Sequence, residues 1–289
     1  MRIRLKNVYN GTHSAAGIDC CCSNILSKGG STLHIIAFTR STPDTAANVT
    51  VDDSGKVVWD GANIVNPWDE YALEEAIAQA KATGSDATVI TIGEEAHEEA
   101  LKHSLAMGMK NAIRVYEDSL DSTDSLTWAT LGAAAVEKAD DAKLVICGKE
   151  SIDVQTDQHI YQLARKLGWV MLSNVSKILE LSDDSIKVER TTDQGVQQVT
   201  AQLPAVISVL KGINEPRYPS FIGIRKASKA TIPVWASSDL GVELPQAVTE
   251  VISYENLPER DMTTEIIEGG SVEEKATKLV DKLLEEKVL

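Results

Sequence analysis

The sequence predicts an α/β fold: an open, mostly parallel sheet with helices on both faces, in a Rossmann-like arrangement. Three observations support this class. Short apolar segments of strand length recur along the chain from Leu33 onwards. Helical segments lie between them, an alternation that implies parallel strands joined by right-handed crossovers. After Gly168 the residues alternate by twos between turns, which predicts a small antiparallel hairpin or meander.

Strands of the parallel sheet are predicted wherever a short apolar segment stands between turn residues. The segments are 33–38, 87–93, 111–117, 143–148 and 204–210. Near-continuous apolar segments of this length are typical of strands that are buried on both faces. The meander is predicted at 176–181, 185–190 and 197–203, with polar turns between the strands.

Helices are predicted between the strands. In segment 66–84, Asn66 can cap the helix start, Pro67 suits the first helical position, and Gly84 ends the helix. Apolar residues from Ile160 to Leu167 recur at helical spacing, and Gly168 ends that helix. Further helices are predicted at 98–108, at 125–139 and at 272–289, and Thr156 or Asp157 can cap the one that begins near Ile160.

The composition excludes several classes of partner. The chain of 289 residues has 28 Lys and Arg against 43 Asp and Glu, a formal net charge of −15. This charge disfavours nucleic acids and anionic membrane surfaces. No apolar run approaches the ~18 residues of a membrane-spanning helix, so no membrane insertion is expected. The four cysteines form no disulfide framework, which favours a reducing, cytoplasmic setting.

The two ends of the chain differ from its middle. Residues 1–32 show no clear period and are predicted to be a disordered leader. Its triplet Cys20–Cys22 has no further ligands at the spacing of a metal site. Residues 33–233 are predicted to form the nucleotide-binding domain, with 211–233 as an extended surface loop. Residues 234–289 are predicted to be a linker followed by an amphipathic helix.

Catalytic motifs are missing from the sequence. Gly148-Lys149 does not fit a Walker phosphate loop, because Lys143 and Glu150 occupy positions that need Gly and Ser or Thr. No GxGxxG follows the first strand, and no GxSxG appears. The five histidines are not spaced as a metal site. No nucleophile with its base can be identified.

The loops after Phe38, Ile92 and Cys147 follow predicted parallel strands, and ligands of open α/β sheets bind at this edge. The third loop ends at a helix start, where free N–H groups and the helix dipole attract anions. Its neutral donors suit ribose and phosphate oxygens, whereas its acidic residues oppose a phosphate unless they point elsewhere. The pattern predicts a nucleotide-type site without catalytic machinery. Alternatively, Asp153 and Thr156 only cap turns and the helix.

Five segments together resemble one family. NPWDEYALEEA, HSLAMGMKNAIRV, LVICGKESID, VERTTDQGVQQVTAQLPAVISV and INEPRYPSFIGIRKA stand in the order and spacing of the electron-transfer flavoprotein β subunit. The resemblance is close over about 33–230. It implies a heterodimer whose α subunit holds the redox FAD. The chain is then an electron-carrier subunit rather than a stand-alone enzyme.

The resemblance also implies which residues contact a nucleotide. They lie at the ends of two strands, at the start of the first helix and in the loop after 143–148. By motif position they are Phe38, Arg40, Asn66, Pro67, Trp68, Asp69, Ile92, Gly148, Lys149, Glu150, Ser151, Ile152, Asp153, Val154, Gln155, Thr156, Asp157, Gln158 and His159.

Two nucleotides are compatible with the resemblance. Many members bury AMP in the β subunit, and electron-bifurcating members hold a second FAD in the same place. PDT at 43–45, NPWDEYALEEA at 66–76, and Asp153 with Thr156 and Gln158 are similar to the bifurcating branch, which favours FAD. Val154, His159-Ile160 and Thr39 depart from it, and a missing glycine limits close backbone approach to a bulky ligand. A bifurcating complex would oxidise NADH and pass electrons to two acceptors, of which ferredoxin is one candidate.

Partner contacts are implied for two segments. In the family, the loop 211–227 docks on acyl-CoA or other flavin dehydrogenases, and Phe221 matches its apolar anchor while Lys226 matches a basic position. Alternatively, Phe221 packs on its own domain or on the α subunit. The C-terminal helix would pack on the α subunit.

Two functions from other classes compete with this interpretation. One is an ATP-binding regulator of the universal-stress type, which shares the sheet. The other is a scaffolding subunit whose loop holds no ligand.

Overall fold

The computed structural model describes residues 2–7, 33–116, 124–139, 141–245, 249–258 and 264–288. The described residues from Ile3 to Glu255 form one compact unit, and those from Asn256 onwards belong to a second. Residues 8–32, with the cysteine triplet, lie outside the described ranges. The disordered leader therefore stays a prediction, although residues 2–7 form the strand β1.

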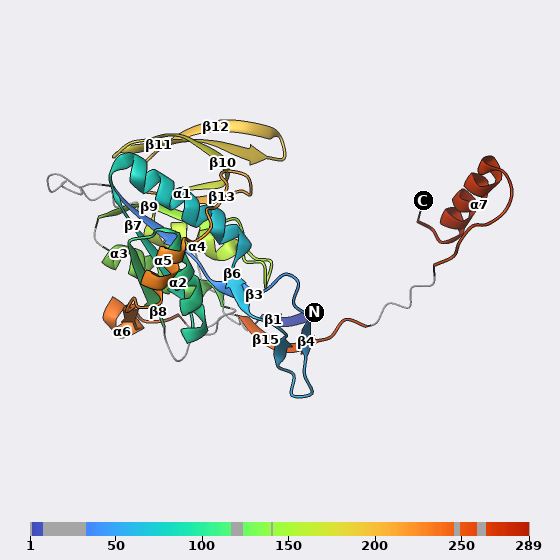
Figure 1. Cartoon of the computed structure of the whole chain (residues 1–289), viewed down its shortest axis with the longest axis horizontal. Coiled ribbons are helices and arrows are strands. Elements are labelled where there is room, and N and C mark those ends of the chain that lie inside the picture. The colour runs from blue at the N-terminus through green and yellow to red at the C-terminus, as the bar shows by residue number, and fades with distance from the viewer. Residues whose placement is uncertain are drawn as a thin grey trace, which may run out of the picture. The chain divides into compact units, whose positions relative to one another are not determined.

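The first unit contains a nine-stranded sheet, which confirms the predicted fold class (Figure 1). Seven neighbouring strands are parallel. In sheet order they are β10 (Val170–Leu181), β13 (Ala205–Val209), β9 (Ala142–Gly148), β2 (His34–Phe38), β7 (Asp86–Ile92), β8 (Asn111–Val115) and β14 (Val234–Trp235). The predicted meander is β10 with the antiparallel strands β11 (Ser185–Thr192) and β12 (Gly195–Gln202), which extend the same sheet beyond β10.

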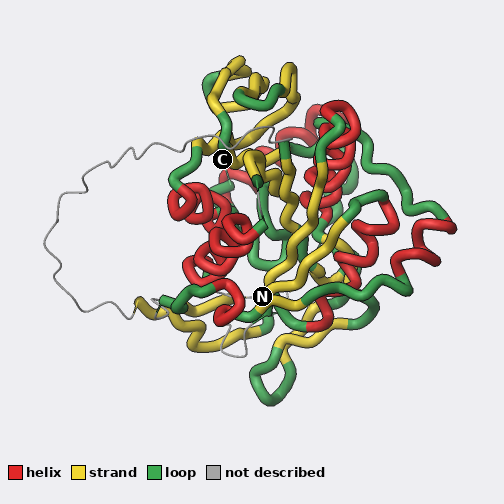
Figure 2. The backbone as a smooth tube through the Cα atoms, turned by 90° about the vertical axis from the view of Figure 1, so that its left-hand side faces the viewer, coloured by secondary structure: helices red, strands yellow, loops and turns green. Residues whose placement is uncertain are grey.

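Helices cover both faces of the sheet (Figure 2). On one face lie α1 (Pro67–Thr83) and α2 (Glu98–Met107), the latter preceded by the 3-10 turn η1 (Glu95–His97); on the other lie α3 (Ser125–Lys138) and α4 (Gln158–Leu167). Successive strand side chains point to opposite faces. In β2, Ile35 and Ala37 therefore belong to the core under α1, whereas Ile36 and Phe38 belong to the core under α3.

Helix ends follow the prediction at the carboxyl side and differ at the amino side. Gly84 and Gly168 end α1 and α4 in left-handed conformations with φ of 69° and 67°. Asn66 precedes α1, but its side chain makes no capping hydrogen bond there. Asp157 precedes α4 with φ −123° and ψ −7°, away from the extended conformation that capping needs, and its side chain makes no capping bond either. The predictions that Asn66 and Asp157 cap these helices through their side chains are therefore wrong.

The segment after β13 is more ordered than predicted. Within the expected loop 211–233, Ser220 caps the short helix α5 (Phe221–Ala227) by accepting a hydrogen bond from Gly223 N. Alpha5 packs on α2, with Ala227 buried. One buried residue gives no periodicity, so the sequence pattern could not indicate this helix.

The expected linker from 234 onwards also contains regular elements. Beta14 is an edge strand of the sheet and pairs with β8. At this pairing Arg114 N donates to Pro233 O at 3.0 Å. The helix α6 (Ser237–Leu240) follows, and β15 (Thr249–Glu255) pairs with β1 (Arg2–Asn7). These elements are too short to show a hydrophobic period.

Two small antiparallel ribbons, not anticipated from the sequence, stand between β2 and α1. One pairs β3 (Ser41–Pro43) with β6 (Asn63–Val65), and the other pairs β4 (Val49–Val51) with β5 (Val57–Trp59). Asp52 stabilises the turn of the second ribbon, because its carboxylate accepts hydrogen bonds from Ser54 N and Lys56 N.

The second unit contains α7 (Val272–Glu285), which starts in a capping box of Ser271 and Glu274. Leu279, Val280 and Leu284 are exposed on this helix within the chain alone. Across the described ranges, none of the helices has both the length and the apolar character needed to span a bilayer.

Candidate functional site: a cavity at the carboxyl edge of the sheet

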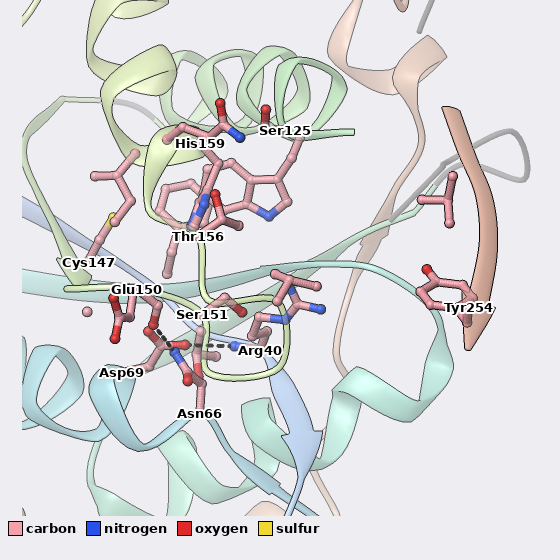
Figure 3. Close-up of a pocket in the computed structure, with 18 residues that line it drawn as sticks. Arg40, Asn66, Asp69, Ser125, Cys147, Glu150, Ser151, Thr156, His159 and Tyr254 are labelled. Carbon is pink, nitrogen blue, oxygen red and sulfur yellow. Dashed lines mark hydrogen bonds between the residues drawn. The ribbon is translucent and has the colours of Figure 1, made fainter. Parts of the chain in front are cut away.

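A cavity of ≈ 210 Å³ lies at the carboxyl ends of β2 and β9, beside the first turns of α1, α3 and α4 (Figure 3). This is the edge at which open α/β sheets bind ligands. Two residues of β15 also line the cavity. The lining comprises Phe38, Thr39, Arg40, Asn66, Asp69, Ser125, Trp128, Cys147, Gly148, Glu150, Ser151, Val154, Thr156, Gln158, His159, Ile160, Val251 and Tyr254.

The close approach of α1 to β9 depends on Gly148. A Cβ at this position would stand 2.5 Å from Asp69 Oδ1 and 2.6 Å from the backbone carbon of Trp68. No side chain fits there without a shift of the helix start. Glycine therefore allows the start of α1 and the loop 149–157 to share one wall of the cavity.

Asn66 holds that loop in place. Its side-chain nitrogen donates to Glu150 O at 2.9 Å, and its oxygen accepts from Ile152 N at 3.2 Å. The side chain is buried. Asn66 thus satisfies two loop backbone groups instead of capping α1.

The loop also fixes its own shape. Ser151 N donates to Thr156 O at 3.0 Å, and the two residues form an isolated antiparallel bridge. Asp153 Oδ1 accepts from Ser151 Oγ at 2.6 Å and from Val154 N at 2.9 Å. Gln155 takes a positive φ of 49° at the tip, a conformation that few residues other than glycine adopt.

Arg40 is the only Lys or Arg among the described lining residues. Its guanidinium pairs with Asp153 at 2.7 Å, and its backbone N–H donates to Asp69 Oδ2 at 3.1 Å. Arg40 Nε and the neighbouring Thr39 Oγ1 are buried without a hydrogen-bond partner in the chain. Buried polar groups in proteins are nearly always satisfied, and both residues line the cavity, which is compatible with a polar ligand there.

Two of the acidic loop residues that argued against a phosphate in the sequence have partners of their own. Asp153 pairs with Arg40, and Glu150 lies 3.6 Å from Lys149 Nζ. Burial raises the pKa of Asp69 to about 7, although hydrogen bonds and the Arg40 charge act in the opposite direction. Part of the Asp69 population is then neutral near pH 7, which lessens its repulsion of an anion.

Two buried side chains next to the sheet are uncharged at neutral pH. Burial lowers the pKa of His159 to about 4, and the charge of Arg40 acts in the same direction. Burial, and secondarily the charge of Asp69, raises the pKa of the Cys147 thiol. A raised thiol pKa disfavours the thiolate, so Cys147 is not an activated nucleophile.

Most of the predicted contacts come together here. Of the predicted residues, Phe38, Arg40, Asn66, Asp69, Gly148, Glu150, Ser151, Val154, Thr156, Gln158 and His159 line the cavity. Pro67, Trp68, Ile92, Lys149, Ile152, Asp153, Gln155 and Asp157 lie outside its lining. Trp68 instead lies under Lys149, with 5.2 Å between Nζ and the ring centre, and Ile92 belongs to the core.

Sequence reasoning missed several lining residues. They are Thr39, Ser125, Trp128, Cys147, Ile160, Val251 and Tyr254. A signal existed for Ser125 and Trp128, since the first turn of a helix after a parallel strand faces the carboxyl edge. None existed for Val251 and Tyr254, which come from a strand without a clear period.

Within the described ranges, no three His, Cys, Asp or Glu side chains gather as metal ligands. The fold and the cavity thus define a class: a doubly wound, Rossmann-like α/β protein with a polar and aromatic cavity at the carboxyl edge of its parallel sheet.

Comparison with known proteins narrows the class. Residues 54–240 match the model of the electron transfer flavoprotein domain. The chain belongs to the electron transfer flavoprotein β-subunit family. This result supports the resemblance and not the universal-stress-type alternative.

Relatives span most of this chain. The electron transfer flavoprotein subunit beta of Bacillus subtilis is 31% identical over 88% of this chain and 98% of its own. Subunit CarD of the caffeyl-CoA reductase-Etf complex of Acetobacterium woodii is 30% identical over 89% of this chain and all of its own. Protein FixA of Azorhizobium caulinodans is 31% identical over 73% of this chain and 78% of its own.

Proposed function

We propose that this chain is one subunit of a heterodimeric electron carrier and that its cavity binds an adenine nucleotide. The observation that carries the proposal is the pair of buried, unpartnered donors, Arg40 Nε and Thr39 Oγ1, at the cavity wall. Membership of the flavoprotein family supports it. Arg40 supplies positive charge, and the helix starts beside it supply free N–H groups for a phosphate.

The flavin supplies the redox chemistry of the complex when it is bound. This chain then needs no nucleophile or general base, in agreement with a cavity whose thiol and imidazole are both neutral at pH 7. Its residues bind and orient the nucleotide. Arg40 and Ser151 face the sugar-phosphate part, and the loop 149–157 covers it.

The nucleotide in this subunit is proposed to be FAD. The motifs around 43–45 and 66–76 are similar to the bifurcating branch, as described above. In such a complex the pair of subunits takes electrons from NADH or a dehydrogenase and divides them between two acceptors, one of them of the ferredoxin type. The other FAD belongs to the α subunit.

AMP is a second candidate, and the size of the cavity favours it. The cavity of ≈ 210 Å³ is below the range of roughly 300–1,000 Å³ that is usual for ligand pockets, and AMP is the smaller molecule. With AMP in this subunit the complex is a simple carrier between a dehydrogenase and another acceptor.

Docking on partner dehydrogenases is proposed for segment 211–227. Phe221 and Tyr218 are 83% and 96% exposed in this chain, so Phe221 is not packed on its own domain. Lys226 is exposed on the same short helix. The exposed apolar residues of α7 are proposed to pack on the α subunit, as the predicted role of residues 234–289 requires.

The test is the nucleotide content of the heterodimer, purified in its native state and then denatured. Two FAD per heterodimer supports the bifurcating carrier, provided that NADH reduces the complex. One FAD and one AMP supports the simple carrier. A heterodimer that releases one FAD and no second nucleotide would overturn the proposal. The alternative that this chain is a scaffolding subunit would then be favoured.

A further inference from the structure

Three aromatic side chains from three different elements form one side of the cavity. Phe38 ends β2, Trp128 lies in the first turn of α3, and His159 lies in the first turn of α4. The rings of Phe38 and Trp128 are 4.9 Å apart at 54°, and those of Trp128 and His159 are 4.6 Å apart at 76°. These are the tilted and edge-to-face arrangements that aromatic pairs prefer. We call these three residues the aromatic wall.

The aromatic wall is held rigidly. Asp124 caps α3 by accepting from Thr127 N at 2.9 Å, which fixes the turn that carries Trp128. Behind the wall, a Cβ at Gly132 would already touch Phe38 Cζ at 3.5 Å and Leu163 Cδ1 at 3.3 Å. The ring of Phe38 therefore packs close to the backbone of α3 at Gly132.

Charge divides the cavity into two parts. The labelled charged residues Arg40, Asp69 and Glu150 lie at one side, and the uncharged Ser125, Thr156 and His159 lie on the other (Figure 3). His159 is uncharged at neutral pH because burial lowers its pKa to about 4. The aromatic wall is thus a neutral surface, and it lies opposite the guanidinium of Arg40.

We propose that Trp128 stacks against the flat heteroaromatic ring of the nucleotide and fixes the direction in which the nucleotide lies. The ring lies on the aromatic wall, and the sugar-phosphate part extends towards Arg40 and Ser151. This inference rests on the proposed nucleotide site and adds its orientation. Every base or flavin has a π face, so stacking holds the ring without reading its hydrogen-bonding edge. The ring is adenine in AMP, and either adenine or isoalloxazine in FAD.

The experiment compares three variants in the heterodimer. Trp128→Leu keeps an apolar side chain but removes the ring, whereas Trp128→Phe keeps a ring. The control is Trp59→Leu, because Trp59 stands on the exposed ribbon β4–β5 away from the cavity lining. The readout is the dissociation constant of the nucleotide that the wild-type complex releases on denaturation, measured by rebinding that purified nucleotide.

Trp128→Leu is expected to raise the dissociation constant about 5- to 150-fold, as loss of a stacking ring does for a nucleotide base. Trp128→Phe is expected to stay within about threefold of wild type, because it restores a π face. Equal constants for the Leu and Phe variants would overturn the stacking role. A wild-type complex without any second nucleotide would instead contradict the proposed function.

Spectra identify which ring is stacked. When the cavity holds FAD and its isoalloxazine lies on Trp128, the visible absorption of that flavin shifts in Trp128→Leu and is restored in Trp128→Phe. When adenine is the stacked ring, binding quenches the Trp128 emission and leaves the flavin band unchanged. Stacking would be contradicted if the nucleotide left the tryptophan emission of the wild type unchanged and the flavin band were the same in wild type and Trp128→Leu.

Discussion

Arg217 donates two parallel hydrogen bonds to Glu74, from Nε to Oε2 at 2.7 Å and from Nη2 to Oε1 at 2.6 Å. The Arg217 backbone N–H also donates to Glu74 Oε2 at 3.2 Å. Nearby, Asn214 donates to Glu75 Oε2 at 2.9 Å and to Tyr71 O at 3.0 Å. The motif NEPRY is therefore an anchor that ties the segment before α5 to the middle of α1.

Arg217→Met is expected to loosen that segment and destabilise the chain by about 1–3 kcal/mol, because the buried Glu74 carboxylate loses its charged partner. Urea unfolding measures the stability. Electron transfer to partner dehydrogenases is expected to fall while nucleotide content stays normal. The control Lys110→Met breaks an exposed pair with Asp86, for which about 0–1 kcal/mol is expected. Equal losses in the two variants would contradict the anchoring role.

Phe221→Ala is expected to weaken docking without changing stability. The side chain is 83% exposed, so its truncation removes little packing within this chain. An apolar anchor at an interface contributes about 2 kcal/mol or more, so the Michaelis constant for the partner should rise roughly thirtyfold. The matched control is Val196→Ala on the outer strand β12, also exposed. Undiminished transfer to every partner tested would exclude this docking role.

Gly148→Ala is expected to disrupt the cavity. The new Cβ would stand 2.5 Å from Asp69 Oδ1, so the start of α1 must shift, at a cost of about 1–3 kcal/mol. The nucleotide is expected to be lost because Asn66 and Asp69 move with the helix. Gly132→Ala is the control, since its nearest contacts are side-chain carbons at 3.3 Å or more. A Gly148→Ala complex with full nucleotide content and wild-type unfolding would show that this close approach is not needed.

Asn66→Ala is expected to release the loop 149–157. The substitution leaves Glu150 O and Ile152 N without their buried partner, which costs about 1–3 kcal/mol. Hydrogen exchange at Ile152 N and nucleotide affinity report the effect. Asn63→Ala removes only an exposed acceptor of Trp59 Nε1, and its expected effect is within about 0.5 kcal/mol. Unchanged exchange at Ile152 would contradict the role of Asn66.

His97→Gln is expected to flatten the pH dependence of stability in the nucleotide-free chain. Burial, and secondarily the charge of Arg40, lowers the pKa of His97 from 6.5 to about 4, while its Nδ1 accepts from Ser41 N at 3.0 Å. The unfolded chain binds the proton more tightly, so this stability is present above 6.5 and lost as pH falls towards 4. The loss at pH 5 is on the order of 2 kcal/mol.

Asp69 acts in the opposite direction over an overlapping range of pH. Its pKa is raised from 3.8 to about 7, so the folded chain binds the proton more tightly. This contribution is fully present below 3.8 and lost as pH rises through 7. With Asp69→Asn, the free energy of unfolding should therefore decrease more steeply as the pH falls. With His97→Gln it should decrease less steeply. Unfolding free energies at pH 5 and 7.5 check both signs, and identical slopes in the two variants would contradict the assignment.

Much of the fold could be predicted because the same sequence pattern, a short apolar strand followed by a helix, recurs along the chain. Each buried strand of the parallel sheet is an apolar segment of standard length, and Gly84 and Gly168 mark helix ends wherever a left-handed residue is needed. Beta14 and α5 could not be predicted in this way. They are short, and long-range contacts hold them in place: the hydrogen bonds from Arg114 N to Pro233 O and from Tyr116 N to Trp235 O for β14, and packing on α2 for α5.

The candidate site was predicted in part, through residues that belong to sequence motifs. Arg40, Asn66 and Gly148 stand next to strand ends or helix starts and were therefore recognisable. Trp128 also stands in the first turn of a helix after a parallel strand, but an aromatic residue in an apolar helix has the same pattern whether it packs in a core or lines a cavity. Only the three-dimensional arrangement with Phe38 and His159 distinguishes these two cases.

The aromatic wall and the proposed docking segment stand on opposite faces of the sheet. The aromatic wall belongs to the layer of α3 and α4, whereas NEPRY and α5 are attached to the layer of α1 and α2. Substitutions at Trp128 are therefore expected to change binding at the proposed nucleotide site and to leave the surface of α5 intact. Conversely, substitutions at Phe221 or Lys226 are expected to change that surface and to leave the aromatic wall in place.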